Sequence, residues 1–419
     1  MAVYSEVLSK ARLARDASRV LGSASTVDKN RLLLMITEAV QNEQQRIIDA
    51  NEVDLDNLKQ KDGYSAAFHD RLLLTEQRIE AMAEGLRQIT ALEDPVGEVT
   101  GMRTRPNGLL IGQVRVPMGV IGIIYEARPN VTVDAAGLAL KAGNAVILRG
   151  SSEAIHSNKV LVQIIREQLL KSGLPEDAVC LIEDTDRAAA RELMRLNGLV
   201  DLLIPRGGRS LIKSVVENST VPVIETGAGN CHVYVDEGAD LEMAAAIVLN
   251  AKLQRPGVCN AMETLLAHRE AAKDFLPAVL PLLLEAGVEI RGCPRTQSYH
   301  PAVKEAVQAD WETEYLDLIL AVRVVDSLSE AVDHINSYGT MHSEAIVTRD
   351  YDRARLFLNS VDAAAVYVNA STRFTDGFEF GLGAEMGIST QKLHARGPMG
   401  LQALTSLKYI IYGSGQIRP

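Results

Sequence analysis

The sequence predicts an α/β protein in which helices cover both faces of a parallel sheet. Short apolar runs rich in valine and isoleucine alternate with amphipathic helical stretches between residues 119 and 236. Such runs are typical of strands buried on both faces, as in parallel sheets. A second alternation begins after Cys259, so we expect two α/β parts with a boundary near residues 254–258. The length of 419 residues also favours more than one domain.

The flanking elements are predicted from residue spacing and turn chemistry. Residues 1–95 carry apolar positions three and four apart, which predicts helices. Two alternating runs in residues 99–117 flank an Asn-Gly pair at 107–108, which favours a hairpin turn. The apolar run within residues 401–419 predicts a terminal strand, and the glycine-rich residues 371–400 predict a long functional loop. The strands expected in the first alternation cover residues 119–127, 144–150, 178–184, 200–205, 221–227 and 231–237.

Composition excludes several classes of function. Lysine and arginine total 43 against 54 aspartates and glutamates, so the net charge of 43 − 54 = −11 argues against nucleic-acid binding. No apolar run is long enough to span a membrane, and the first residues lack the apolar core of a secretory signal. The four cysteines include no CxxC pair, and the eight histidines show no metal-site spacing. We therefore expect a cytoplasmic protein without a metal, acting on a small molecule.

Neither common nucleotide fingerprint is present. The sequence contains no GxxxxGK[ST] and no GxGxxG after a strand. The best phosphate-binding candidate is Gly207-Gly208, where a strand ends and a helix starts near Arg209. Backbone N–H groups at a helix start can hold a phosphate. An ordinary strand-to-helix turn explains the same residues, and the pattern alone favours that interpretation.

Cys259 is the candidate nucleophile. Pro256 and Gly257 end a helix before it and a strand follows, so its thiol is expected on a loop between the two domains. A buried and inert cysteine is the alternative. Cys180 and Cys231 lie inside apolar runs and fit that alternative, and Cys293 is interpreted as an incidental loop residue.

Other polar residues are weaker candidates. Glu225 ends the apolar run VPVIE of the expected strand, where a carboxylate could act as a general base or bind a ribose or a substrate amine. A solvent-facing carboxylate is the alternative. Four loop residues are candidates for binding an anionic substrate, although most such residues are merely solvated: Arg128, Asn130, Asn369 and Arg373.

Several long strings carry a resemblance to a known family. They are VIGIIYEARPNVTVDAAGLALKAGNAVILRG, DLLIPRGGRSL, QRPGVCNAMETLL, VYVNASTRFTDG and STQKLHARGPMGL. They closely resemble the gamma-glutamyl phosphate reductase family and, more distantly, the aldehyde dehydrogenase superfamily. The resemblance implies an aldehyde-dehydrogenase-like fold with a doubly wound NADP-binding domain (1–98 and 118–254) and an α/β catalytic domain (255–400). A small β oligomerisation unit (99–117 and 401–419) completes it and implies a homo-oligomer.

The resemblance also implies an activity. The family reduces L-glutamyl 5-phosphate with NADPH to L-glutamate 5-semialdehyde and phosphate, a step in proline biosynthesis. Cys259 would form a thioester by displacing phosphate, so no ATP site is needed. A functional contact with glutamate 5-kinase, which makes the labile substrate, is a further expectation. A hydrolytic aldehyde dehydrogenase and a nucleotide-binding scaffold without chemistry are the alternatives.

Site residues follow from the resemblance. The residues expected at the cofactor are Arg149, Ser151, Ser152, Gly207 and Gly208. Ser152 replaces a frequent ribose-binding glutamate of the superfamily, which favours NADP, although Glu153 lies next to it. Ala127 occupies the position of the superfamily's oxyanion-hole asparagine, and Asn130 is the nearest substitute. Glu225 aligns with the base that activates water, a role that a reductase does not need.

Overall fold

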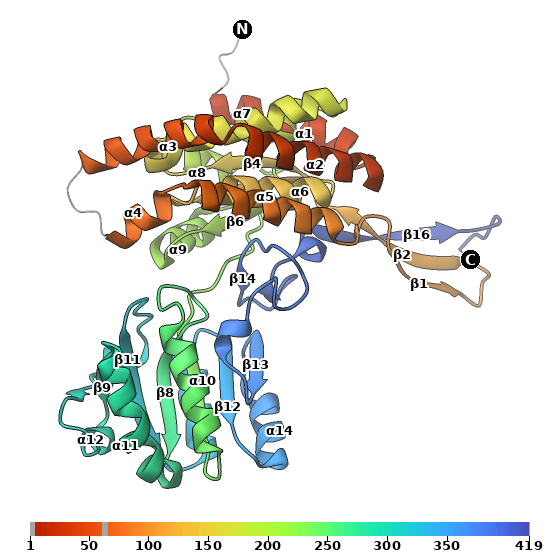
Figure 1. Cartoon of the computed structure of the whole chain (residues 1–419). Helices are drawn as coiled ribbons and strands as arrows, with labels where there is room; N and C mark the ends of the chain where they lie inside the picture. Colours follow the sequence, from red (N-terminus) through yellow and green to blue (C-terminus); the bar gives the residue numbers. More distant parts are fainter. Residues whose placement is uncertain (1–4, 61–65, 419) are drawn as a thin grey trace. The chain divides into compact units, whose positions relative to one another are not determined.

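The computed structural model describes residues 5–60 and 66–418, which form two compact units. The first unit consists of residues up to Thr226, Gly381–Gly387 and the residues from Met399 onward. The second consists of Gly227–Phe380 and Ile388–Pro398. Both are drawn in Figure 1, where colour follows the sequence.

The first unit contains a four-stranded parallel sheet in the order β5-β4-β3-β6. Its strands are β3 (Val120–Tyr125), β4 (Ala145–Arg149), β5 (Val179–Leu181) and β6 (Leu202–Arg206). Its helices are α1 (Glu6–Leu21), α2 (Thr26–Asn42), α3 (Gln44–Lys59), α4 (Ala66–Leu72), α5 (Glu76–Ala91), α6 (Asn130–Lys141), α7 (Ile155–Ser172), α8 (Arg187–Leu193) and α9 (Arg209–Asn218), with short 3₁₀ turns η1 (Ser152–Ala154), η2 (Glu176–Ala178) and η5 (Leu401–Leu404). Every residue of β3 is buried, which confirms the prediction of a parallel sheet covered on both faces.

The expected helices of residues 1–95 are confirmed by α1 to α5, apart from residues 1–4 and 61–65, which lie outside the described residues. Packing explains why they form. Val7, Ala11 and Ala14 of α1 lie three and four apart and pack against the sheet residues Val120 and Ile147. Helices α2, α5, α6 and α7 pack against one another in a separate layer (Figure 1).

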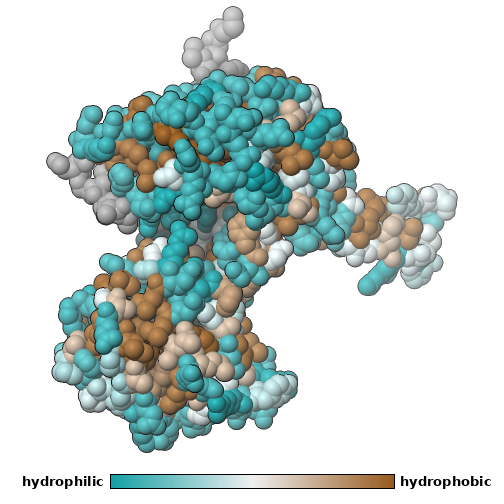
Figure 2. Space-filling model, in the orientation of Figure 1, coloured by the Kyte–Doolittle hydropathy of each residue, from teal (hydrophilic) through white to brown (hydrophobic). Residues whose placement is uncertain are grey.

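A three-stranded antiparallel sheet completes the first unit. Its strands are β1 (Val99–Thr104), β2 (Leu110–Pro117) and β16 (Thr405–Tyr412) in the order β1-β2-β16. The predicted hairpin is confirmed, with Gly108 at a φ of 87° in its turn. The predicted terminal strand is also confirmed, since β16 pairs with β2 along its whole length. Leu407 and Ile411 of β16 are exposed, and Figure 2 shows apolar surface over this sheet.

The second unit contains a seven-stranded sheet in the order β10-β9-β11-β8-β7-β12-β13, and all of its strand pairs are parallel. Its strands are β7 (Cys231–Val235), β8 (Met262–His268), β9 (Glu289–Gly292), β10 (Lys304–Glu305), β11 (Ile319–Val325), β12 (Ser343–Val347) and β13 (Ala365–Val368), and a separate antiparallel pair is formed by β14 (Ile388–Ser389) and β15 (Gly397–Pro398). Its helices are α10 (Leu241–Leu253), α11 (Arg269–Glu285), α12 (Pro294–Gln297), α13 (Leu328–Tyr338) and α14 (Tyr351–Ser360), with 3₁₀ turns η3 (Gln308–Trp311) and η4 (Thr372–Phe374). Helices α10 and α11 share one apolar cluster with the sheet, whereas α13 and α14 share another.

Two expectations about the strands are wrong. Residues 221–227 form no strand, because Val223 makes only an isolated bridge with Leu203. Residues 231–237 form β7, which belongs to the second sheet, where it lies between β8 and β12. The apolar side chains of α10 also pack against β8 and α11, so the units divide after Thr226 and not near residues 254–258. Among the described residues, no helix combines the length and apolar character needed to cross a membrane.

Asn51 joins three segments of the first unit. Its buried amide donates to the carbonyl oxygen of Leu72 at 2.9 Å and to Ser157 Oγ at 3.1 Å, and its oxygen accepts from the N–H of Leu74 at 2.7 Å. Buried backbone groups of this kind are costly to leave without partners. Asn51 therefore holds the chain after α4 against α3 and α7.

We predict that Asn51→Ala lowers the free energy of unfolding by about 2–3 kcal/mol, because the buried Leu74 N–H and Leu72 carbonyl lose their hydrogen-bond partner. Thermal unfolding followed by circular dichroism measures the change. Asn57→Ala, at an exposed position of the same helix, is the matched control and should shift stability by less than about 0.5 kcal/mol. Equal losses in the two variants would contradict the role of Asn51.

Candidate active site

Cys259 lies on the turn between α10 and β8, within the second unit. The expectation that it lies on a loop between the two domains is therefore wrong, because β7 and α10 precede it in the same unit. Cys259 is half-buried, unlike Cys180 and Cys231, which are buried. The turn lies at the edge of the sheet where β7, β8 and β12 begin.

Neighbouring backbone fixes this turn. A β-carbon at Gly229 would come 1.4 Å from the carbonyl oxygen of Cys259, so only glycine fits there. Asn260 Nδ2 donates to the carbonyl oxygen of Thr375 at 2.8 Å. The hydroxyl of Thr372 donates to the carbonyl oxygen of Asn260, also at 2.8 Å. The chain beyond β13 is thus bound to the turn that carries Cys259.

These contacts bring one predicted substrate residue to Cys259. Arg373 lies in η4, between Thr372 and Thr375, and its Nε donates to Gln254 Oε1 at 2.8 Å. Burial and the neighbouring Arg255 lower the pKa of Arg373, while Cys259 acts in the opposite direction. The Arg373 guanidinium group therefore interacts electrostatically with Cys259, and Arg255 adds a second positive charge near Arg373. Such cations favour a thiolate and an anionic leaving group.

Asn369, the other candidate of this unit, is not brought to Cys259. It follows β13, at the edge where the strands end, whereas Cys259 precedes β8 at the edge where they begin. Its amide donates to the carbonyl of Thr348 and accepts from the Thr348 N–H, both at 2.9 Å. The side chain thus joins the ends of β12 and β13.

A buried ion pair that was not predicted from the sequence joins the elements before and after the Cys259 turn. Lys252 Nζ of α10 lies 2.6 Å from Glu263 Oε2 of β8, and both side chains are fully buried. Burial raises the pKa of Glu263 to about 7 and lowers the pKa of Lys252. Glu263 also accepts from the N–H of Leu316, and Glu314 accepts from the N–H of Gly229. The sequence signal for this pair is a single charged residue within each of two apolar segments, Lys252 in α10 and Glu263 in β8.

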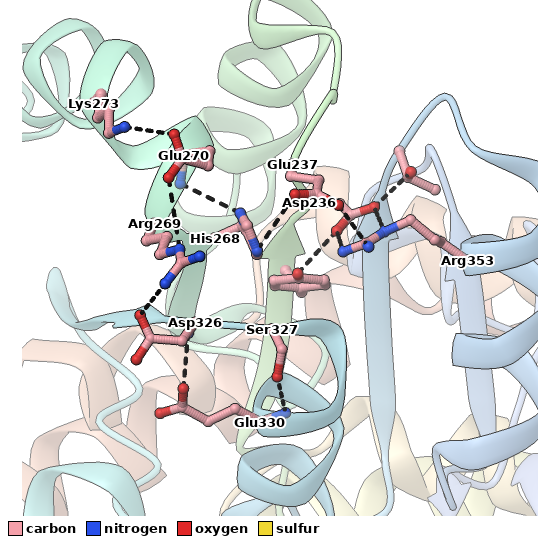
Figure 3. A network of polar contacts seen from close by, with 12 residues as sticks. Asp236, Glu237, His268, Arg269, Glu270, Lys273, Asp326, Ser327, Glu330 and Arg353 are labelled. Carbon is pink, nitrogen blue, oxygen red and sulfur yellow. Dashed lines mark hydrogen bonds and ion pairs between the residues drawn. The ribbon is translucent and has the colours of Figure 1, made fainter.

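The carboxyl edge of the same sheet is closed by ion pairs (Figure 3). Arg353 binds both Asp236 and Glu237 at the end of β7. Glu237 also lies 3.8 Å from His268 Nε2 at the end of β8. Ligands of open α/β sheets usually bind at this edge. Here the charged groups bind one another, and the candidate nucleophile lies at the other edge.

In the first unit, the phosphate-binding candidate Gly207-Gly208 forms a strand-to-helix turn, and a carboxylate lies in that turn. Gly207 and Gly208 lie between β6 and α9. The N–H of Gly208 donates to Glu126 Oε1 at 3.0 Å, and a β-carbon at Gly207 would come 2.6 Å from the Glu126 carboxyl carbon. A carboxylate at a helix start occupies the position that favours an anion. The sequence analysis missed Glu126.

The remaining cofactor candidates lie at the same edge of this parallel sheet, after β4. Arg149 donates from its NH2 group to the carbonyl oxygens of Thr185 (2.7 Å) and Asp186 (3.1 Å). Among the described residues, Arg149 Nε and Ser151 Oγ find no hydrogen-bond partner although both atoms are buried. Ser152 is exposed and donates to Glu153 Oε1 at 2.9 Å.

Four further candidates belong to the first unit. Glu225 is half-buried and lies in the irregular segment after Val223. Asn130 is exposed at the start of α6, and its Nδ2 donates to Asp134 Oδ2 at 3.1 Å. Arg128 is half-buried before α6. Ala127 is buried in a small cluster with Leu55, Leu58, Leu72 and Ala154, so its methyl group serves the core.

The other cysteines differ in reactivity. Burial raises the pKa of Cys180 to about 11, consistent with an inert core thiol. Cys293 is half-buried. Burial alone would raise its pKa, but hydrogen bonds from Thr296 and from the N–H of Val324 bring it below the ordinary value. Cys259 and Cys293 are thus the two cysteines that are not fully buried.

Comparison with known proteins identifies the family. The model named "Aldehyde dehydrogenase family" matches residues 2–289. The gamma-glutamyl phosphate reductase of Moorella thermoacetica is 64% identical over 418 residues, the whole of both chains. That of Carboxydothermus hydrogenoformans is 64% identical over 413 residues, 99% of each chain.

The chain belongs to the gamma-glutamyl phosphate reductase family.

Solved structures agree with this family assignment. The crystal structure of gamma-glutamyl phosphate reductase from Thermotoga maritima has a TM-score of 0.96 and 50% identity, covering 99% of this chain and 100% of that chain. An acetylating aldehyde dehydrogenase from Geobacillus thermoglucosidasius has a TM-score of 0.70 at 17% identity, over 99% of this chain and 98% of that one. These likenesses confirm the predicted aldehyde-dehydrogenase-like fold. The protein is thus an enzyme of the gamma-glutamyl phosphate reductase family within the wider aldehyde dehydrogenase family.

Proposed function

We propose that this enzyme reduces L-glutamyl 5-phosphate to L-glutamate 5-semialdehyde and phosphate with NADPH, a step towards proline. The observation that carries the proposal is the braced, half-buried Cys259, which interacts electrostatically with Arg373, itself close enough to Arg255 to feel its charge. A thiol among guanidinium groups suits a substrate that carries both an acyl carbon and a phosphate. The names of relatives 64% identical over the whole chain support the same reaction.

The chain's own residues account for the acyl transfer. The thiolate of Cys259 attacks the acyl carbon, the bond from that carbon to the phosphate oxygen breaks, and phosphate leaves with the electron pair. Arg255 and Arg373 stabilise the negative charge that builds up on the leaving group. Held by Arg149, Ser151, Gly207 and Gly208, a nicotinamide cofactor would supply the hydride for reduction of the thioester carbon. The carbon–sulfur bond then breaks, so Cys259 returns to the thiolate and the aldehyde is released.

The residues at the carboxyl edge of the first unit's sheet fit a dinucleotide. Arg149 Nε and Ser151 Oγ are buried polar atoms without a hydrogen-bond partner in the described chain, and a ligand would satisfy them. Gly207 and Gly208 would hold a phosphate once Glu126 leaves the N–H of Gly208. The short side chain of Ser152 leaves room for the 2′-phosphate of NADP.

The three-stranded sheet β1-β2-β16 would join subunits of a homo-oligomer. The exposed apolar side chains of Leu407 and Ile411 favour burial in an interface. Transfer of the labile substrate from a glutamate 5-kinase in the cytoplasm completes the proposed setting.

We predict that Cys259→Ala lowers kcat by roughly 10³-fold or more and leaves NADPH binding intact, because the nucleophile is lost. Phosphate-dependent reduction of NADP by glutamate 5-semialdehyde measures the rate, and fluorescence titration measures binding. Cys180→Ala and Cys293→Ala are the matched controls and should retain most activity. Near-normal turnover of Cys259→Ala would overturn the thioester mechanism.

We predict that kcat/KM for NADPH exceeds that for NADH by about tenfold or more, since Ser152 admits the 2′-phosphate. Ser152→Glu should reverse this preference, because a carboxylate repels the phosphate and accepts from a free ribose hydroxyl. Steady-state kinetics with both cofactors measure the ratio. Equal values for the two cofactors in the wild type would count against the small-residue argument.

We predict that Glu126→Gln tightens NADPH binding about two- to fivefold, because the variant removes a negative charge from the start of α9. The dissociation constant is measured by fluorescence titration without substrate. Glu217→Gln, the same charge change near the other end of α9, should leave the constant unchanged. Weaker binding of NADPH by Glu126→Gln would show that the carboxylate assists the cofactor.

We predict that Glu225→Gln retains most of the reductive rate, because phosphate is already anionic and hydride transfer needs no base at this residue. Loss of a working general base would instead cost roughly 10²–10⁴-fold. The assay is reduction of freshly generated glutamyl phosphate at saturating NADPH. A loss of that size would favour the hydrolytic aldehyde dehydrogenase, for which a base at Glu225 is essential.

A further inference from the structure

The buried thiol of Cys231 touches the backbone of the candidate nucleophile. Cys231 is the first residue of β7 and pairs in register with Met262 of β8, just beyond the Cys259 turn. Its Sγ lies 3.2 Å from the carbonyl oxygen of Cys259, well within reach of an S–H···O hydrogen bond. The sequence analysis interpreted this cysteine as inert, and its full burial agrees with that view. Its contact with the Cys259 carbonyl, however, gives this cysteine a connection to the candidate nucleophile.

The direction of this hydrogen bond follows from the surroundings. Burial, the carboxyl group of Glu344 and the neighbouring Cys259 raise the pKa of Cys231 well above the ordinary value. The thiol is therefore protonated at neutral pH and donates to the carbonyl oxygen, which can only accept. A thiol kept protonated is also a poor nucleophile, so Cys231 does not compete with Cys259 for the substrate.

The same thiol belongs to a buried polar chain that returns to the Cys259 turn. Its Sγ lies 3.7 Å from His342 Nδ1, which lies 2.8 Å from Ser343 Oγ. The hydroxyl of Ser343 donates to Thr375 Oγ1 at 2.6 Å. The carbonyl of Thr375 accepts from the Asn260 amide at 2.8 Å. This series of hydrogen bonds therefore contacts the turn at two carbonyl or amide groups, one of Cys259 and one of Asn260.

Gly229 limits how the turn can respond. The Cα of Gly229 faces the Cys259 carbonyl so closely that no β-carbon fits between them. The carbonyl oxygen is therefore held by contact with Gly229 and by hydrogen bonding with Cys231. The carbonyl carbon is bonded to the Cα that carries the nucleophilic side chain, so restraining the carbonyl also restrains the position of that Cα.

We propose that Cys231 is a positioning residue for Cys259: its thiol hydrogen bond to the Cys259 carbonyl fixes the backbone position from which the nucleophilic side chain projects. Displacements of an ångström at a reacting group are enough to cost large factors in rate. This inference rests on the proposed role of Cys259 as the nucleophile. It makes a buried thiol, absent from the predicted site, part of the reaction geometry.

The test compares Cys231→Ala with Cys231→Ser in the full-length enzyme. We expect Cys231→Ala to lower kcat about tenfold while KM for the semialdehyde and the dissociation constant of NADPH stay within twofold. Cys231→Ser should recover kcat to within about threefold, because its hydroxyl donates to the same carbonyl oxygen. Wild-type kcat in Cys231→Ala, or equal losses in both variants, would overturn the proposal.

A second readout needs no substrate. Iodoacetamide alkylation of Cys259 is followed by mass spectrometry in a Cys293→Ala background, which removes the other accessible thiol. The rate constant should fall several-fold in Cys231→Ala and recover in Cys231→Ser. Cys180→Ala and Cys180→Ser, at a buried thiol of the first unit, form the matched control pair and should change nothing. An unchanged alkylation rate in Cys231→Ala would contradict positioning.

Folding failure of Cys231→Ala would leave a direct measurement. The infrared S–H stretch of Cys231 is obtained as the difference between wild type and Cys231→Ser. A band shifted to low frequency supports the hydrogen bond, whereas the frequency of an unbonded thiol overturns it. Failure of the proposed function is distinguished by Cys259→Ala. Turnover by Cys259→Ala would contradict the proposed role of Cys259 as the nucleophile. An inactive Cys259→Ala together with a fully active Cys231→Ala would contradict only the proposed role of Cys231.

Discussion

The approach of Gly229 to the carbonyl of Cys259 is the constraint on which the candidate active site depends. No side chain fits between the segment that leads into β7 and the turn that leads into β8. That closeness lets the thiol of Cys231 reach the Cys259 carbonyl and lets Glu314 accept from the Gly229 N–H. A half-buried nucleophile on a turn would otherwise sample many directions. Here the turn leads directly into β8 and lies beside the start of β7, and every residue of both parallel strands is buried.

The two units use opposite edges of their sheets. In the first unit, the cofactor candidates follow β4 and β6, at the carboxyl edge where open α/β sheets usually bind ligands. In the second unit, Cys259 precedes β8 at the amino edge, and ion pairs around Arg353 and Asp236 tie the carboxyl edge together. The rule that ligands bind at the carboxyl edge of an open α/β sheet therefore agrees with the candidate residues of the first unit and not with those of the second. The chemistry of each edge, not the fold, decides where a reaction can take place.

Local charge runs against the overall charge of the chain. The protein is acidic, yet Arg373 interacts electrostatically with the half-buried Cys259, and Arg255 acts on Arg373. At the start of α9 the opposite holds, since the Glu126 carboxylate takes the N–H that a cofactor phosphate would need. The buried pair Lys252 and Glu263 adds a fixed interaction beneath the turn. Burial of both charges is costly, so the pair is better understood as fixing geometry than as a source of stability.

The sequence by itself determined the elements of this protein. Continuous apolar runs predict buried parallel strands, the Asn107-Gly108 pair predicts the hairpin, and Pro256-Gly257 predicts the turn that carries Cys259. Each of these signals is local, since it depends on residues a few positions apart. The long strings of family resemblance added the fold and the hypothesis that Cys259 is the nucleophile.

Only the tertiary structure decided which elements are neighbours. β7 joins the second sheet, although its sequence fits either sheet equally well, because its partners β8 and β12 and the helix α10 share its core. Residues 221–227 look like a strand but form only isolated bridges, one of them between Val223 and Leu203. Glu126 meets Gly208 across 82 positions and Cys231 meets Cys259 across 28. No periodicity or turn signal encodes such contacts, because they depend on how strands far apart in the chain are placed side by side.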